Sequence, residues 1–218
     1  MSGLESRGPI AFDRETSRRN FLKTAAWTGA ALSAMGIGGF AASRADAQDA
    51  PYTTYQGLGD AAILQFAYQL ELLEGNFYAI GADSGLFADT FLDQIAVIRD
   101  HEFAHAEAIA ATLGDLGAEV PAEPAFTFPE DATADAATFL GYAATLEPVG
   151  IGAYQGAAPA LESKDILAAA ISIHNAECQH RAAINIMNLV VPPNDVAFEE
   201  ALPLAAVQDA VAPFGITG

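Results

Sequence analysis

The feature that most constrains the fold of this sequence is an internal repeat, in which four chemically important residues recur in the same order and at nearly the same spacing. In each copy a Glu is followed seven residues later by a Tyr, and a Glu-x-x-His motif begins 31 or 30 residues after the first Glu. The copies consist of Glu71, Tyr78, Glu102 and His105, and of Glu147, Tyr154, Glu177 and His180. The two Glu-x-x-His motifs are offset by 75 residues. This pattern predicts two half-sites related by a pseudo-twofold axis.

Helical periodicity runs through the segments that carry the repeat. Apolar residues recur at three- and four-residue spacing in four stretches, which predicts helices at 58–81, 86–115, 132–156 and 164–190. No stretch alternates as a strand would. Residues three apart on a helix lie on one face, so each Glu-x-x-His motif directs a carboxylate and an imidazole to the same place. The sequence therefore predicts an all-α bundle of four helices.

The connections between these segments predict how the helices are joined. Short links at 81–85 and around Pro159 make the first two and the last two helices antiparallel neighbours. The segment 117–132 contains three prolines, which favour extended backbone. Sixteen extended residues span about 50 Å, whereas a helix of about 25 residues is about 37 Å long. We expect two antiparallel hairpins joined by one crossover along the bundle.

The donor types in the repeat are those of a two-metal site. Four Glu and two His from four helices form the ligand set of di-iron and di-manganese carboxylate proteins. One Glu-x-x-His motif is common by chance, but two in register, each preceded by a Glu, favour a site. Their apolar surroundings strengthen this interpretation, since buried charges need partners or a metal. We predict these metal ligands, with the first Glu of each copy bridging: Glu71, Glu102, His105, Glu147, Glu177 and His180.

Three further residues are predicted to lie around the ligands. Glu74 is one turn beyond Glu71, but its counterpart in the repeat is Gly150, so we expect it beside the ligands or at the surface. Arg99 and His174 occupy matching places one turn before the Glu-x-x-His motifs. They are expected to orient the ligand carboxylates, or else to form ordinary interhelical salt bridges.

Two tyrosines are candidates for a catalytic role. Tyr78 and Tyr154 lie two turns beyond the lone Glu residues, where they can hydrogen-bond a ligand or pass an electron during oxidation. The alternative is core packing with a satisfied hydroxyl group. His101 and Glu107 lie off the ligand stripe and are expected to face solvent.

The N-terminal segment predicts export. Residues 17–23, Ser-Arg-Arg-Asn-Phe-Leu-Lys, resemble the twin-arginine translocation signal. A weakly hydrophobic stretch at 24–42 and a small-x-small site at 45–47 follow, so we expect cleavage after Ala47 and a periplasmic or extracellular protein. A retained membrane anchor is the alternative, which the Gly and Ala content and the cleavage site disfavour. Proteins exported by the twin-arginine route cross the membrane already folded, so a metal can be acquired inside the cell, where its supply is controlled.

The charge balance excludes two classes of partner. The chain has 9 basic and 28 acidic residues, of which 6 and 4 fall within residues 1–47, leaving 3 basic against 24 acidic residues. So acidic a surface repels phosphate backbones and anionic headgroups, and nucleic acid and membrane surfaces are not expected partners. Solubility is the favoured explanation of the acidity, ahead of attraction of cations.

The chain resembles a known family. The matching residues are the segments 70–78, 100–105 and 175–180, together with Glu147 and Tyr154. They resemble the exported ferritin-like domain family that includes bacterial desiccation-related proteins, over residues 58–190. The resemblance implies a metal-centred helical bundle and a setting in stress protection. One departure is Pro148, which is expected to kink or break the third helix beside Glu147.

These observations give a domain division and three functional hypotheses. We expect a signal peptide at 1–47, a linker at 48–57, the bundle at 58–190 and a tail at 191–218 with one short helix. The first hypothesis is an oxidase or peroxidase with two iron ions, acting on dioxygen or hydrogen peroxide. The second is a catalase-like enzyme with two manganese ions, and the third a non-enzymatic acidic stress or structural bundle. Iron storage is disfavoured because no self-complementary assembly surface is identified, and a homodimer is compatible with the sequence.

Overall fold

The structure, a computed structural model, describes residues 51–216. These residues form five α-helices and three short 3₁₀-helices, without a strand among them. The α-helices are α2 (Asp60–Asp83), α3 (Asp89–Asp115), α4 (Ala136–Ala157), α5 (Lys164–Met187) and α6 (Leu204–Val211). The predicted all-α bundle is confirmed. The predicted signal peptide at 1–47 lies outside the described residues.

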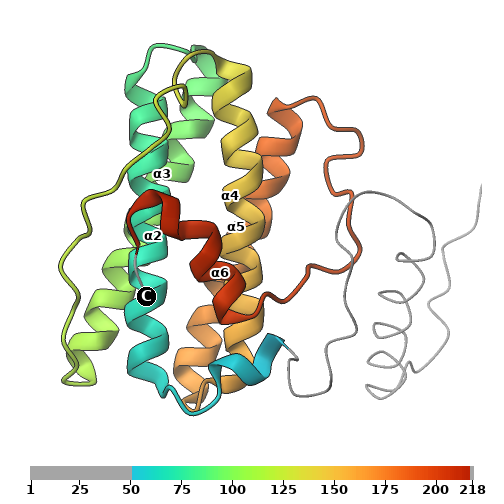
Figure 1. Cartoon of the computed structure of the whole chain (residues 1–218). Coiled ribbons are helices and arrows are strands. Elements are labelled where there is room, and N and C mark those ends of the chain that lie inside the picture. The colour runs from blue at the N-terminus through green and yellow to red at the C-terminus, as the bar shows by residue number, and fades with distance from the viewer. Residues whose placement is uncertain (1–50, 217–218) are drawn as a thin grey trace, which may run out of the picture. The chain divides into compact units, whose positions relative to one another are not determined.

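The four long helices form two hairpins, α2–α3 and α4–α5. Figure 1 shows these helices side by side, with the connection between α3 and α4 running along the bundle. This connection, residues 116–135, contains no helix and joins the two hairpins as expected. It is fastened to the C-terminal segment by a hydrogen bond of 3.0 Å from the Thr127 amide to the Phe214 carbonyl. The observed topology is that of a ferritin-like bundle.

Local capping places the helix ends a few residues from their predicted positions. The Asp135 carboxylate accepts a hydrogen bond of 2.7 Å from the Thr138 amide, so α4 begins at Ala136 rather than at 132. Ser163 caps α5 in the same way. That helix ends at Met187, three residues early, and is followed by Leu189 in a left-handed conformation with φ of 60°. The apolar periodicity of the sequence continues past the start of α4 and the end of α5, so it could not locate these two helix ends.

The predicted break at Pro148 is wrong. Helix α4 is continuous from Ala136 to Ala157 with Pro148 inside it. The proline ring is exposed, so the carbonyl group that loses its helical partner is on the side where water can satisfy it. Glu147, the preceding residue, is fully buried. The proline therefore leaves the predicted ligand inside the bundle.

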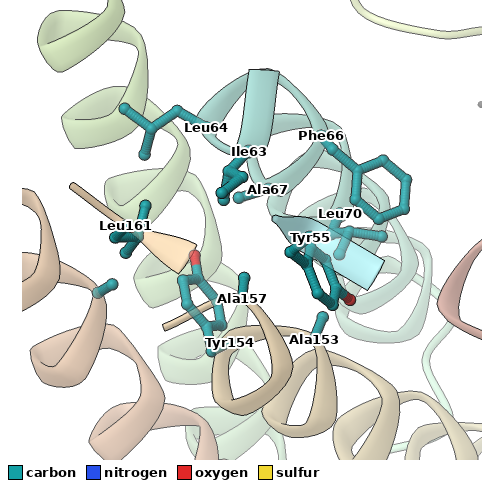
Figure 2. A pocket seen from close by; sticks show the side chains of 11 residues that line it. Tyr55, Ile63, Leu64, Phe66, Ala67, Leu70, Ala153, Tyr154, Ala157 and Leu161 are labelled. Carbon is teal, nitrogen blue, oxygen red and sulfur yellow. The ribbon is translucent and has the colours of Figure 1, made fainter. Parts of the chain in front are cut away.

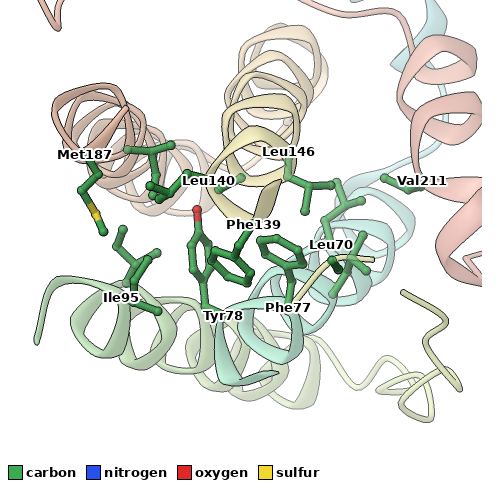
Figure 3. Packing of buried hydrophobic residues seen from close by; sticks show 14 of the residues in the cluster. Leu70, Phe77, Tyr78, Ile95, Phe139, Leu140, Leu146, Met187 and Val211 are labelled. Atoms are coloured by element: carbon green, nitrogen blue, oxygen red, sulfur yellow. The ribbon is translucent and has the colours of Figure 1, made fainter. Parts of the chain in front are cut away.

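Aromatic packing fixes the two hairpins against each other. Figure 3 shows Phe139 of α4 between Phe77 and Tyr78 of α2. The Phe77 and Phe139 rings are stacked with centroids 4.4 Å apart, and Tyr78 meets Phe139 edge-on at 6.1 Å. All three side chains are fully buried. Because Tyr78 belongs to the repeat, this core holds a residue of the predicted site in place.

The C-terminal segment covers one side of the bundle. Helix α6 buries Val207 and Val211 in the same core as Phe77. The chain before it reaches α4 through a hydrogen bond of 2.9 Å from the Leu202 amide to the Gly152 carbonyl. A side chain at Gly156 would lie 2.2 Å from the Leu202 carbonyl oxygen, so glycine permits this close approach.

Candidate metal centre

The six predicted ligands meet inside the bundle. Each of the helices α2 and α4 contributes one Glu, and each of α3 and α5 contributes a Glu-x-x-His motif. The four carboxylate side chains are at most 1% exposed. The side chain of His180 is 4% exposed and that of His105 is 14% exposed. Four antiparallel helices thus bring together residues that lie up to 109 positions apart in the chain (180 − 71).

The side chains form two clusters of prospective ligand atoms that share one residue. Within each cluster, one ligand atom from each residue lies within 4.8 Å of the others. The first cluster consists of Glu71, Glu102, His105 and Glu177, and the second of Glu102, Glu147 and His180. The two clusters are therefore candidate metal positions, with Glu102 common to both.

Glu102 belongs to both clusters. One of its oxygens, Oε2, is 3.1 Å from Nδ1 of His105, and the other, Oε1, is 2.8 Å from Nδ1 of His180. The sequence interpretation assigned bridging to Glu71 and Glu147, but each of those residues lies in only one cluster. Glu177 also lies near both imidazoles, with Oε1 3.4 Å from Nδ1 of His105 and 3.8 Å from Nδ1 of His180.

Unpartnered polar atoms show that the donor set fits metal ions. Among the described residues, five buried ligand atoms lack a hydrogen-bond partner: Oε1 of Glu102, Oε2 of Glu147, both carboxylate oxygens of Glu177, and Nδ1 of His180. The 2.8 Å approach of His180 to Glu102 does not have hydrogen-bond geometry. Buried polar groups are nearly always paired, and leaving them unpaired is costly. Cations coordinated by these lone pairs would satisfy them together.

The electrostatics of the centre also call for added positive charge. Burial raises the pKa of the Glu102 carboxyl to about 8. Burial, followed by repulsion from neighbouring carboxylates, raises the pKa values of Glu147 and Glu177 well above their usual range. For His105, burial lowers the pKa, but the adjacent carboxylates of Glu102, Glu177 and Glu71 outweigh it and raise the pKa to about 12. Protons held here occupy places that cations would otherwise take.

The two tyrosines of the repeat bind across the pseudo-twofold axis. The Tyr78 hydroxyl of α2 donates a hydrogen bond to Oε1 of Glu147 on α4, and the Tyr154 hydroxyl of α4 donates to Oε1 of Glu71 on α2. Burial and the adjacent carboxylates raise the pKa of both phenols, so they remain protonated donors. Each tyrosine therefore orients the lone Glu of the opposite hairpin.

Arg99 and His174 do not reach the ligands as the sequence interpretation expected. The Arg99 guanidinium group pairs with Asp100 at 2.7 Å, and its side chain is 29% exposed, because a long cationic side chain extends to water when it can. His174 meets Gln155, with Nε2 3.3 Å from the amide oxygen. Neither residue orients a ligand carboxylate in this structure.

His101 is exposed, as expected, but its ring also reaches a predicted ligand. Its Nδ1 lies 3.0 Å from Nε2 of His180, the nitrogen that faces away from the carboxylates. The two rings are stacked with centroids 5.2 Å apart. The repeat gave no signal for this residue, since its counterpart is Ala176. The spacing of four residues between His101 and His105 was the available indication. Glu107 is exposed, as expected.

Glu74 is buried beside the centre and belongs to neither cluster. A Cβ atom at Gly150 would lie 3.1 Å from Oε1 of Glu74 and 3.2 Å from Oε2 of Glu177. The glycine of one hairpin thus leaves room for the additional carboxylate of the other. Burial and four nearby carboxylates raise the pKa of Glu74 well above its usual range.

Comparison with known proteins identifies the family. A model of the ferritin-like domain family matches residues 59–189, which is more than half of the chain and includes all six prospective ligands. The chain belongs to the ferritin-like domain family. No curated protein matches the sequence. The ferritin-like family and the two clusters together fit a ferritin-like di-metal protein.

Proposed function

We propose that this ferritin-like protein is an oxidoreductase with two iron ions that acts on dioxygen or hydrogen peroxide in stress protection. The observation that carries the proposal is the set of five unpartnered buried ligand atoms, distributed over two clusters that share Glu102. Two Fe(II) ions would supply two electrons, enough to reduce hydrogen peroxide to water or dioxygen to peroxide.

The side chains of the centre have distinct tasks in this proposal. Glu102 would hold both ions through its two oxygens, while His105 and His180 would each hold one. The hydroxyl groups of Tyr78 and Tyr154 each fix one oxygen of a lone Glu. The other oxygen of Glu147 is unpartnered, and that of Glu71 meets Nδ1 of His105. These phenols keep a proton at the edge of each cluster, and the surrounding core excludes bulk water.

A centre with two manganese ions and catalase-like activity is the second candidate. The observation that favours it is the high share of oxygen donors. The clusters contain four Glu and two His, and the carboxylate of Glu74 lies beside them. Carboxylate oxygen suits manganese as well as iron. The choice between these metals depends on which ion the purified protein contains.

Export by the twin-arginine route is part of the proposal. The Ser-Arg-Arg-Asn-Phe-Leu-Lys segment supports it, and so does the advantage of folding around a metal before export. Among the described residues, none of the helices combines the length and the apolar character that crossing a membrane requires. A periplasmic or extracellular protein that acts on oxidants would fit the stress protection that the resemblance to the exported ferritin-like family implies.

Elemental analysis followed by anaerobic loading tests the proposed function. The protein is purified from its native export route, loaded with Fe(II), and exposed to dioxygen or hydrogen peroxide while iron oxidation is followed optically. We expect two metal ions per chain and turnover. Glu107→Gln, a substitution at an exposed site on α3, should behave like the wild type. Fewer than two ions per chain would contradict the two-metal centre. Two ions without turnover would leave the non-enzymatic bundle as the better explanation.

A further inference from the structure

A second feature of the bundle, an apolar cavity, adjoins the metal centre. It is bounded by the 3₁₀-helix η1 (Pro51–Tyr55) and by α2, α4 and α5. The space open to the centre of a water-sized sphere is about 30 Å³, compared with the roughly 10–15 Å³ that one water molecule needs. The lining consists of Ala, Leu, Ile and Phe side chains together with Tyr55 and Tyr154.

Tyr154 connects this cavity to the centre. Its ring lines the cavity, and its hydroxyl group donates a hydrogen bond to Oε1 of Glu71. The other oxygen of Glu71 lies 3.0 Å from Nδ1 of His105. A molecule in the cavity is therefore separated from the first cluster by a single side chain. Figure 2 shows the rings of Tyr55 and Tyr154 with Ala157 between them in this view.

Tyr55 supplies the one free polar group in the lining. The residue is 2% exposed, and its hydroxyl group has no hydrogen-bond partner among the described residues. Burial raises the pKa of this phenol to about 12, so it stays a neutral donor. The Tyr154 hydroxyl is already engaged by Glu71. An ordered water needs two to four polar partners, and the lining of this cavity offers at most one that is not already engaged.

A wider groove lies outside the cavity. It has a volume of about 450 Å³, and its lining includes the polar residues Gln65, Gln69 and Glu119. Tyr55, Ile63 and Phe66 line both the groove and the cavity. These three side chains therefore separate the two spaces, and a movement of an aromatic ring would connect them. The groove, the cavity and Tyr154 lie in succession toward Glu71, with these three side chains between the groove and the cavity.

We propose that this cavity holds a small apolar oxidant with an O–O bond, either dioxygen or a short-chain alkyl hydroperoxide, next to the metal centre. The inference rests on the proposed function and narrows its substrate. Hydrogen peroxide carries two hydroxyl groups, and one free donor cannot replace the hydration that they would lose. An apolar molecule loses little hydration, and one of its oxygen atoms can accept a hydrogen bond from the Tyr55 hydroxyl group.

Xenon binding tests the cavity independently of any metal or reaction. Xenon occupies dry apolar cavities, so crystals of the protein under xenon gas should show an anomalous peak between Tyr55 and Tyr154. The variant Ala67→Leu fills part of the lining and should abolish the peak. Ala61→Leu is the matched control, since Ala61 is also half-buried on α2 but does not line the cavity. A cavity without xenon in the wild-type crystals would overturn the inference.

Kinetics of the iron-loaded protein test the occupant. Ala67→Leu should raise KM for dioxygen and for ethyl hydroperoxide by about tenfold, because one added side chain obstructs a small pocket. Metal content and the KM for hydrogen peroxide should be unchanged. Tyr55→Phe distinguishes the two occupants. It should raise KM about fivefold for ethyl hydroperoxide, which accepts the hydrogen bond, and leave dioxygen unaffected.

The outcomes separate this inference from the proposed function. Turnover of dioxygen with equal KM in wild type, Ala67→Leu and Ala61→Leu would overturn the cavity as the oxidant site and leave the metal centre standing. Xenon in the cavity without turnover of any oxidant would overturn both the oxidant assignment and the proposed function. A preference for hydrogen peroxide over both apolar oxidants would overturn the cavity assignment alone.

Discussion

The two hairpins contribute the same ligand types but surround them differently. In the α2–α3 hairpin, Nδ1 of His105 lies within 3.4 Å of three carboxylates. In the α4–α5 hairpin, Nδ1 of His180 approaches Glu102 at 2.8 Å, while its other nitrogen meets His101. The first cluster is therefore richer in negative charge than the second. Pseudo-twofold symmetry in the ligands does not extend to the groups around them.

Glu74 and Gly150 reinforce this difference, because they occupy equivalent places in the two hairpins. One hairpin adds a buried carboxylate and the other provides the space for it. A duplicated bundle can in this way keep six symmetric ligands while its two metal positions acquire different affinities and reactivities. Such asymmetry would let one ion bind and react before the other.

The largest expected effect comes from removing the shared ligand. Glu102→Ala should abolish stoichiometric metal binding because both clusters lose a ligand, whereas Glu147→Ala should retain about one ion per chain. Elemental analysis after loading and desalting measures this difference, with the exposed Glu107→Ala as the control. Equal loss in both ligand variants would show that the clusters do not bind independently.

The second prediction concerns protons in the metal-free protein. Three adjacent carboxylates overcome the effect of burial and raise the pKa of His105 to about 12, so its ring should keep both protons at pH 8. Burial lowers the pKa of His180, whose ring should be neutral at that pH. Ring nitrogen chemical shifts in NMR spectra of the metal-free protein distinguish the two states. A neutral His105 at pH 8 would remove the proposed charge difference between the hairpins.

The same pKa shifts predict how stability depends on pH. Groups with a raised pKa in the folded protein stabilise it fully below their unfolded pKa, and this contribution is lost as pH rises through the folded value. For Glu102 the folded value is about 8. Urea unfolding of the metal-free protein should therefore show a free energy of unfolding that falls as pH rises from about 5, just above the ordinary carboxyl value, to about 8. Metal-loaded protein should fall less, since its carboxylates are already ionised.

A smaller effect is expected at the position where the hairpins differ by a side chain. Gly150→Ala forces Glu74 and Glu177 to move, because the new methyl group would lie 3.1–3.2 Å from their oxygens. Metal affinity should fall about tenfold, a value typical of changes next to the ligands. Gly141→Ala is the matched control on α4, since its Cβ would meet no atom within 4 Å. That variant should keep its metal affinity and gain roughly 0.5–1 kcal/mol of stability.

The smallest effect is expected at His101. Its ring meets only the outer nitrogen of His180, so His101→Ala should weaken one metal position by roughly two- to tenfold, the equivalent of one hydrogen bond. Calorimetric titration with Mn(II) resolves the two binding steps. We expect the affinity of only one of these two binding steps to change. A change in both steps would mean that His101 acts on the shared Glu102 instead.

The sequence by itself determined the helices, the long crossover and the six residues that meet inside the bundle. Spacing of three and four residues defines a helical face, and a repeat of Glu and His at matching positions can be recognised without any knowledge of how the helices pack. The sequence did not determine that Glu102 lies between the imidazoles or that the tyrosines bind across the axis. Those contacts join residues of different helices.

Tertiary structure alone decided which neighbours surround each ligand. Pro148 is tolerated because its ring faces solvent, His101 reaches His180 because α3 and α5 are adjacent, and Arg99 turns to Asp100 at the surface. The rotation and separation of helices set these contacts, and one-dimensional periodicity carries no information about them. The same is true of the cavity beside Tyr154, which exists only where η1 packs against three helices.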